Sequence, residues 1–105
     1  MEFFETFVFT KLIQKLISDE EYRLLQLQLS VRPEFGDVIK GSGGIRKLRW
    51  GGSGRGKRGG IRVIYYYFAE DGQIYMLYAY PKSDKDDLTA DQLKQLKQLV
   101  EEQLL

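Results

Sequence analysis

The sequence contains no cysteine and no histidine in its 105 residues. Without cysteine the chain has no disulfides, no thiolate metal ligands and no thiol nucleophile. Without histidine it lacks the commonest general base near neutral pH and the commonest metal ligand. Serine–histidine–aspartate, cysteine–histidine and histidine-based zinc chemistry are therefore excluded. Proton transfer in an active site would have to use lysine, arginine, tyrosine, a carboxylate or water.

The chain also lacks any apolar run of about 18 residues, the length that a membrane-spanning helix needs. Its N-terminus, MEFFETFVFTKL, begins acidic and has no basic region of the kind that starts a signal peptide. We therefore expect a cytoplasmic protein with no membrane partner. The length fits a single domain over residues 1–105, and the 43% hydrophobic and 30% charged composition is typical of a chain that folds.

Positive charge is concentrated in the middle of the chain. Residues 38–69 hold eight basic and no acidic side chains, whereas residues 1–37 and 70–105 are net negative, at −3 and −4. Such segregation favours an anionic partner, and nucleic acid is the first candidate. A solvated basic loop is the simpler alternative. The eight basic residues are Lys40, Arg46, Lys47, Arg49, Arg55, Lys57, Arg58 and Arg62.

The first third of the chain predicts a strand and two helices. Residues 2–9 (EFFETFVF) are typical of a strand, and residues 10–17 carry apolar side chains at helical spacing. Ser18 and Glu21 form a capping box that should start a second helix, which ends before Pro33. The two helices should form an αα-hairpin.

Three strands are predicted in the second half. Residues 45–50 (IRKLRW) alternate between two faces, and residues 61–69 (IRVIYYYFA) are rich in β-branched and aromatic side chains. The glycine-rich segment between them, residues 51–60, is expected to be an irregular loop. An Asp-Gly turn at residues 70–73 leads into a returning strand at residues 74–79.

The end of the chain predicts one more helix. Pro81 is expected to lie outside the sheet, because proline has no N–H to donate. A capping box at residues 89–92 starts a helix with a stripe of leucine and valine. The order is therefore β-α-α-β-β-β-α. We predict one small α+β domain, with an antiparallel sheet of about four strands covered on one face by helices.

The glycine-rich segment raises the question of a nucleotide-binding loop, but neither common pattern fits. The Walker pattern needs serine or threonine after its lysine, whereas Arg58 follows Lys57. The GxGxxG pattern must open a helix, whereas a strand follows here. We therefore expect a cationic loop attached to a sheet.

The basic residues of the sheet form a candidate phosphate-binding surface. Lys47 and Arg49 share a face of one strand and Arg62 lies on the next, where neighbouring side chains are about 5 Å apart. Arginine can fork onto phosphate oxygens, and lysine acts as a point charge or, with its pKa lowered by cations, as a base. Tyrosines of the strands could stack on bases, although packing is their simpler role. These tyrosines are Tyr65, Tyr66, Tyr67, Tyr75, Tyr78 and Tyr80.

Three segments together resemble the HigB-type toxins of the RelE/ParE superfamily. They are residues 37–47 (DVIKGSGGIRK), residues 56–66 (GKRGGIRVIYY) and residues 80–89 (YPKSDKDDLT). The combination carries the resemblance, since any one segment would be weak. The expected order of strands and helices also agrees with the RelE-like fold of that family.

The resemblance implies the toxin of a type II toxin–antitoxin system, whose partner would be a cognate helix-turn-helix, HigA-like antitoxin. Such toxins are ribosome-dependent endoribonucleases (mRNA interferases), which cut translated mRNA by attack of a 2′-hydroxyl on the adjacent phosphate and so inhibit translation. They need no metal and no other cofactor. The alternative is a ParE-like toxin, which inhibits DNA gyrase by binding and cuts no RNA. A plain RNA-binding module is a third interpretation.

The resemblance also implies roles for single residues. Arg62 matches a catalytic arginine that stabilises the transition state, and as a cation on an open sheet face it is expected outside the core. Lys57 and Lys82 are both candidates for proton transfer. Leu88-Thr89 stand where some relatives carry tyrosine or histidine, so the choice between the two lysines stays open. The residues expected to bind RNA are Arg46, Lys47, Arg49, Arg55, Arg58 and Lys85.

Overall fold

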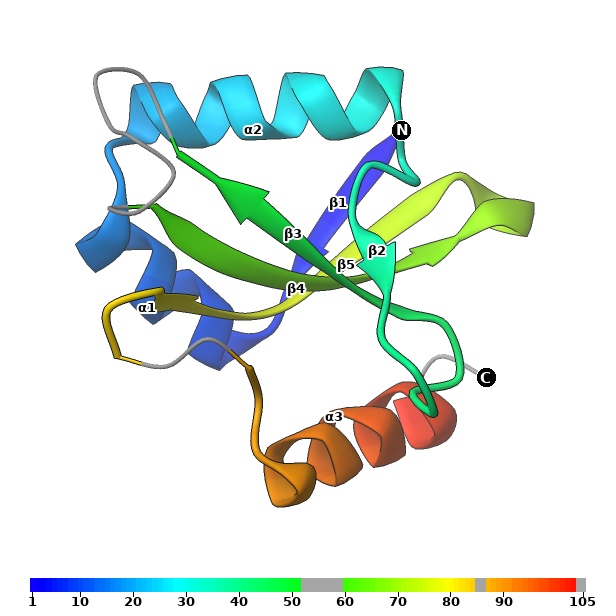
Figure 1. Cartoon of the computed structure of the whole chain (residues 1–105). Helices are drawn as coiled ribbons and strands as arrows, with labels where there is room; N and C mark the ends of the chain where they lie inside the picture. The colour runs from blue at the N-terminus through cyan, green and yellow to red at the C-terminus, as the bar shows by residue number, and fades with distance from the viewer. Residues whose placement is uncertain (52–59, 85–86, 104–105) are drawn as a thin grey trace.

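The computed structural model describes residues 1–51, 60–84 and 87–103. Within these residues five strands form one mixed sheet in the order β1-β5-β4-β3-β2 (Figure 1). The strands are β1 (Glu2–Glu5), β2 (Asp37–Val38), β3 (Ile45–Trp50), β4 (Ile61–Phe68) and β5 (Gln73–Pro81). The helices are α1 (Phe7–Leu16), α2 (Asp19–Val31) and α3 (Ala90–Gln103). The predicted α+β class is confirmed, while most of the predicted loop at 51–60 lies outside the described residues.

The sheet differs from the expected one at both of its edges. β2 is an additional strand of two residues at one edge. At the other edge β1 pairs parallel with β5, so the sheet is not purely antiparallel. β1 stops at Glu5 instead of Phe9, because Thr6 caps α1 and its hydroxyl accepts a hydrogen bond from the Phe9 N–H at 3.0 Å.

β5 continues two residues beyond its predicted end. Pro81 pairs with Ile61, and the next bond of the ladder runs from the Lys82 N–H to the Gly60 carbonyl at 3.1 Å. Pro81 therefore occupies a position whose nitrogen points away from β4, and no ladder bond is lost. The prediction that Pro81 lies outside the sheet is wrong.

Both predicted capping boxes start helices. The Ser18 hydroxyl accepts from the Glu21 N–H at 3.1 Å at the beginning of α2. At α3 the bonds are reciprocal, because the Thr89 hydroxyl accepts from the Gln92 N–H at 3.1 Å and the Gln92 side chain accepts from the Thr89 N–H at 3.0 Å. α1 and α2 are joined through Ile17 and Ser18 alone, and the rings of Phe9 on α1 and Tyr22 on α2 lie 5.9 Å apart, centre to centre.

Helices cover both faces of the sheet, not one. α1 and α2 pack on the first face, where Phe9 and Leu25 meet Val63 and Met76. α3 packs on the second face, so that it lies across the sheet from α2 (Figure 1). The second core consists of Ile45, Ile64, Leu77, Tyr80 and Val100. The six tyrosines of β4 and β5 belong to these two cores or pack against them, which is the simpler of their two predicted roles.

The glycines between β2 and β3 form a tight turn. Gly41, Gly43 and Gly44 have φ angles of 76°, 76° and 108°, a region that only glycine adopts readily. The buried Ser42 closes the turn, because its hydroxyl accepts from the Ile45 N–H at 3.0 Å and donates to the Ile45 carbonyl at 3.1 Å. This segment therefore shapes the β2–β3 hairpin.

Tyr65 ties the connection between α2 and β2 to the sheet. Its hydroxyl donates to the Pro33 carbonyl at 2.7 Å and accepts from the Gly36 N–H at 2.8 Å. Burial raises the pKa of the Tyr65 phenol, so the group stays neutral and keeps the proton that it donates. The connection held in this way leads directly into β2.

Replacing Tyr65 by phenylalanine should lower the free energy of unfolding by about 1–3 kcal/mol, because the buried Gly36 N–H loses its acceptor. Chemical denaturation measures the change. Tyr67→Phe is the matched control, since Tyr67 lies two residues further on the same face and its hydroxyl makes no hydrogen bond to a described residue. We expect Tyr67→Phe to lower the free energy of unfolding by less than about 0.5 kcal/mol. Equal losses in both variants would contradict a stabilising role for the hydrogen bonds of the Tyr65 hydroxyl.

Candidate functional site

A cavity of about 620 Å³ lies at the end of β3, between the sheet and the start of α3. Among the described residues β2 pairs with β3 only at Arg46 and Lys47. The cavity is lined from both faces of the sheet along the rest of β3. The charged residues among its described lining are Asp37, Lys47, Arg49, Arg62 and Asp87. A volume of this size is in the range of small-molecule sites, which is enough for a nucleotide.

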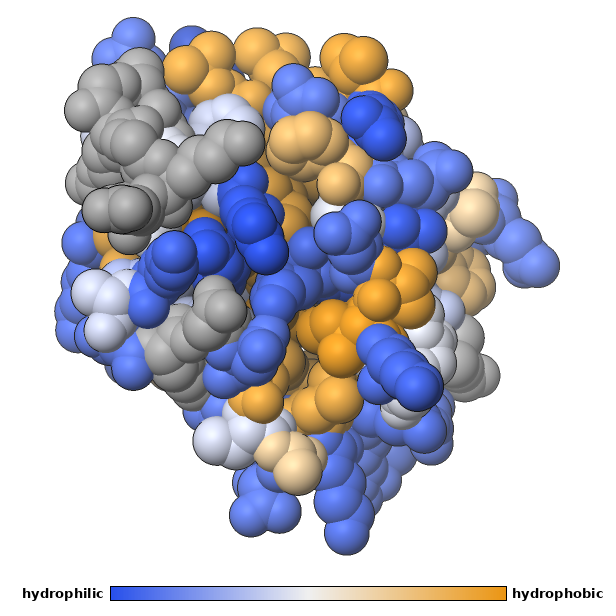
Figure 2. Space-filling model, in the orientation of Figure 1, coloured by the Kyte–Doolittle hydropathy of each residue, from blue (hydrophilic) through white to orange (hydrophobic). Residues whose placement is uncertain are grey.

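Three of the predicted basic residues meet at this cavity. Arg49 lies directly opposite Arg62 in the β3–β4 ladder, and Lys47 is two residues away on the same face as Arg49. Figure 2 shows hydrophilic surface in the middle of this side of the molecule, bordered by apolar surface. Like charges opposite one another in a ladder repel. An anion bound between the two arginines would relieve that repulsion.

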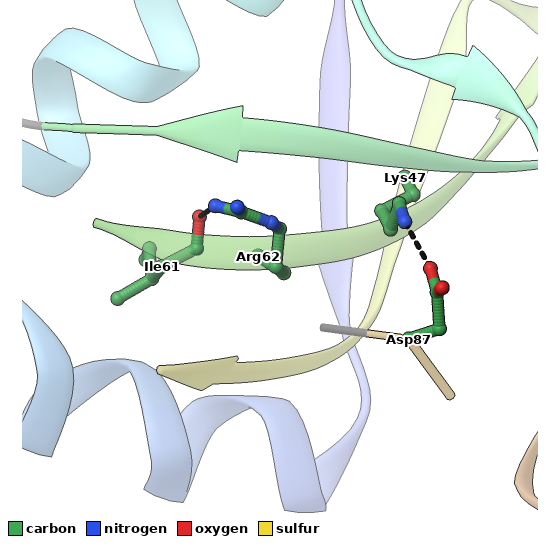
Figure 3. A network of polar contacts seen from close by, with 4 residues as sticks. All are labelled: Lys47, Ile61, Arg62 and Asp87. Carbon is green, nitrogen blue, oxygen red and sulfur yellow. Dashed lines mark hydrogen bonds and ion pairs between the residues drawn. The ribbon is translucent and has the colours of Figure 1, made fainter. Parts of the chain in front are cut away.

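Arg62 lies at the floor of the cavity and only 2% of it is exposed. One of its terminal nitrogens donates to the Ile61 carbonyl at 3.3 Å (Figure 3). The expectation that Arg62 lies outside the core is wrong, because β4 is a central strand flanked by β3 and β5. Arginine does not lose its proton in proteins, so the buried group holds a permanent positive charge at this depth.

Asp87 adds a carboxylate that the sequence interpretation did not include in the site. Lys47 donates to it and forms an ion pair across the cavity (Figure 3). This contact with Lys47 holds the pKa of the Asp87 carboxyl below its usual range, and the charges of Arg49 and Arg62 act in the same direction. Asp87 is part of the YPKSDKDDLT segment, so a signal was present, but the sequence alone did not give it a partner.

The cavity also has an aromatic wall, which comes from the face of the sheet opposite to the cations. Trp50 and Phe35 line the cavity, and both also pack against the first core. Aromatic surfaces next to basic side chains are typical of sites that hold single-stranded nucleic acid. The sequence interpretation assigned base stacking to tyrosines and missed these two residues.

The other predicted site residues lie elsewhere. Arg46 is on the opposite face, where it donates to the Gly36 carbonyl at 2.7 Å, so it does not line the cavity. The half-buried Lys82 follows β5 beside Gly60, two ladder positions from Arg62, and is not among the lining residues. Four predicted residues lie outside the described ranges: Arg55, Lys57, Arg58 and Lys85.

Two further properties concern the described residues only. Among residues 1–51, 60–84 and 87–103 no group of three or more acidic side chains is placed to hold a metal ion. None of the helices in this part of the chain is long and apolar enough to cross a bilayer.

The comparison with protein families agrees with the fold. A family model described as the RelE toxin of the RelE/RelB toxin–antitoxin system matches residues 1–104. The match includes every strand and helix described above, and it includes the residues that line the cationic cavity. The chain therefore belongs to the RelE toxin family.

Proposed function

We propose that this protein is a ribosome-dependent endoribonuclease that cuts translated mRNA and so inhibits translation. Membership of the RelE toxin family supports the class of activity. The observation that carries the proposal is the meeting of Lys47, Arg49 and Arg62 at one cavity with an aromatic wall. These cations match the charge of an RNA backbone, and the wall offers a surface for a base.

The chemistry would use the cations of the chain itself. The 2′-hydroxyl oxygen attacks the adjacent phosphorus and its proton passes to a base. The bond to the 5′-oxygen then breaks, and that oxygen takes up a proton. The products are a 2′,3′-cyclic phosphate and a 5′-hydroxyl. Negative charge builds on the phosphoryl oxygens during attack, so a buried, fixed cation stabilises the transition state more than the ground state.

We assign that role to Arg62, because it lies at the cavity floor. The exposed Arg49 would hold a neighbouring phosphate with its planar fork. Lys57 and Lys82 remain the candidates for proton transfer. We propose no requirement for a metal ion, since the charge that a metal would supply comes from these side chains.

Arg46 receives a different role in this proposal. Its hydrogen bond to Gly36 supports the connection that leads into β2, and β2 forms part of the cavity wall. Arg46 would therefore act on RNA binding through the position of β2 rather than by contact with RNA.

We further propose that the chain is of the HigB type, with a helix-turn-helix antitoxin and a site of action on cytoplasmic ribosomes. The three segments at residues 37–47, 56–66 and 80–89 support the subtype. The adjacent reading frame tests it. A small helix-turn-helix protein encoded there is the expected finding, and neighbours without such a protein would contradict the subtype.

Expression of the chain without its antitoxin tests the proposed function against gyrase inhibition. We expect incorporation of labelled amino acids to stop before DNA synthesis is affected. Co-expression of the antitoxin should restore incorporation and is the control. Induction of DNA-damage signalling with intact translation would contradict the proposal and support the ParE-like alternative.

A further inference from the structure

The cavity already contains an anion that belongs to the chain. The Asp87 carboxylate contacts Lys47, and the side chains differ in exposure, at 72% for Asp87 and 21% for Lys47. The lysine is thus part of the cavity wall, while the carboxylate stands on the side that solvent and a ligand reach first. An incoming phosphate would meet Lys47 already paired.

The contact is of a kind that a ligand can replace. Asp87 precedes the N-terminal cap of α3 and belongs to no helix or strand. Ion pairs with one well-exposed partner contribute little to stability, because water screens the charges. Phosphate oxygens accept the same kind of charge-assisted hydrogen bond and carry the same sign of charge. Replacement of the Asp87 carboxylate by a phosphate at Lys47 therefore costs little free energy.

We propose that Asp87 is a displaceable internal anion, which occupies the phosphate position at Lys47 in the free toxin and gives way to an RNA phosphate on binding. This inference deepens the proposed function and rests on RNA binding at the cavity. It makes Asp87 a residue that lowers the affinity for RNA. A residue that only positioned Lys47 for RNA would raise the affinity instead. Replacement of Asp87 therefore separates the two roles, because the affinity for RNA should rise in the first case and fall in the second.

The test measures binding of a fluorescent eight-nucleotide 2′-O-methyl oligouridylate to the full chain at several salt concentrations. Asp87→Asn should bind about three- to fivefold more tightly than wild type at low salt. Its plot of log affinity against log salt should be steeper than that of wild type, because salt screens the Lys47–Asp87 attraction and so weakens the competition with phosphate in the wild type alone. Asp84→Asn is the matched control, since it removes the same charge from an exposed residue of the same segment. It should leave the slope unchanged.

A double-mutant cycle with Lys47→Met completes the test. In that background Asp87→Asn should have no effect on affinity, because the cation that it releases is absent. The inference is overturned if Asp87→Asn weakens binding or leaves it unchanged, if its effect persists without Lys47, or if no variant binds the probe. The probe has no 2′-hydroxyl and cannot be cut. Tighter binding by a protein that cuts no mRNA would therefore leave this inference standing and remove the nuclease function.

Discussion

Replacing Arg62 by alanine should lower mRNA cleavage by about 100-fold or more. The buried guanidinium lines the cavity, where we propose that charge builds during attack on phosphorus. Removal of one preorganised group of this kind typically costs 100- to 1,000-fold, to order of magnitude. Cleavage of a reporter message in a purified translation reaction measures the loss.

Two further substitutions separate catalysis from folding at this position. Arg62→Met keeps most of the volume and removes the charge, so it should be as inactive as Arg62→Ala. Arg62→Lys keeps the charge without the planar fork and should retain part of the activity. Thermal melts by circular dichroism give the folded fraction of each variant. A folded Arg62→Met protein that cuts at the wild-type rate would remove Arg62 from the site.

Replacing Phe9 by alanine should lower the free energy of unfolding by about 3–5 kcal/mol. Phe9 is 0% exposed and anchors α1 in the first core, so its loss leaves a cavity between the helix and the sheet. In a domain of this size the melting temperature should fall by more than about 10 °C. Chemical denaturation of the variant and the wild type gives the difference directly.

Phe7→Ala is the control for Phe9→Ala. Phe7 lies on the same helix but is 74% exposed. Its ring contacts the Lys11 ammonium, which lies 4.4 Å from the ring centre. Its removal should cost less than about 1 kcal/mol. A comparable loss in both variants would show that burial of Phe9 does not anchor the helix.

The parts of the fold that depend on short-range patterns were predictable. The alternation in residues 45–50 placed Lys47 and Arg49 on one face, and the β3–β4 register confirms that face. The capping boxes at Ser18 and Thr89 are local hydrogen bonds, so three or four residues of sequence are enough to predict them.

Other parts depend on contacts between distant residues. The run EFFETFVF has the composition of a strand, but the cap at Thr6 turns its second half into α1. β2 has only two residues and no pattern of its own, because pairing with β3 defines it. The apolar stripe of α3 likewise does not specify the face of the sheet on which the helix packs, because that face depends on tertiary contacts.

The same reason explains the errors at the site. Arg62 and Asp87 are polar residues with ordinary local surroundings in the sequence. The burial of Arg62 follows from the central place of β4, and the partner of Asp87 is 40 positions away at Lys47. Such neighbours become visible only when the sheet and the segment before α3 are assembled.

The most direct test of the central claim is the chemistry of RNA ends in a purified translation reaction that contains this protein. We predict new 5′-hydroxyl ends and 2′,3′-cyclic phosphates within translated codons, and none when ribosomes are left out or when Arg62→Met replaces the wild type. Arrest of translation with intact mRNA would contradict the claim that the cavity cuts RNA. Equal cutting of untranslated RNA would contradict its dependence on the ribosome.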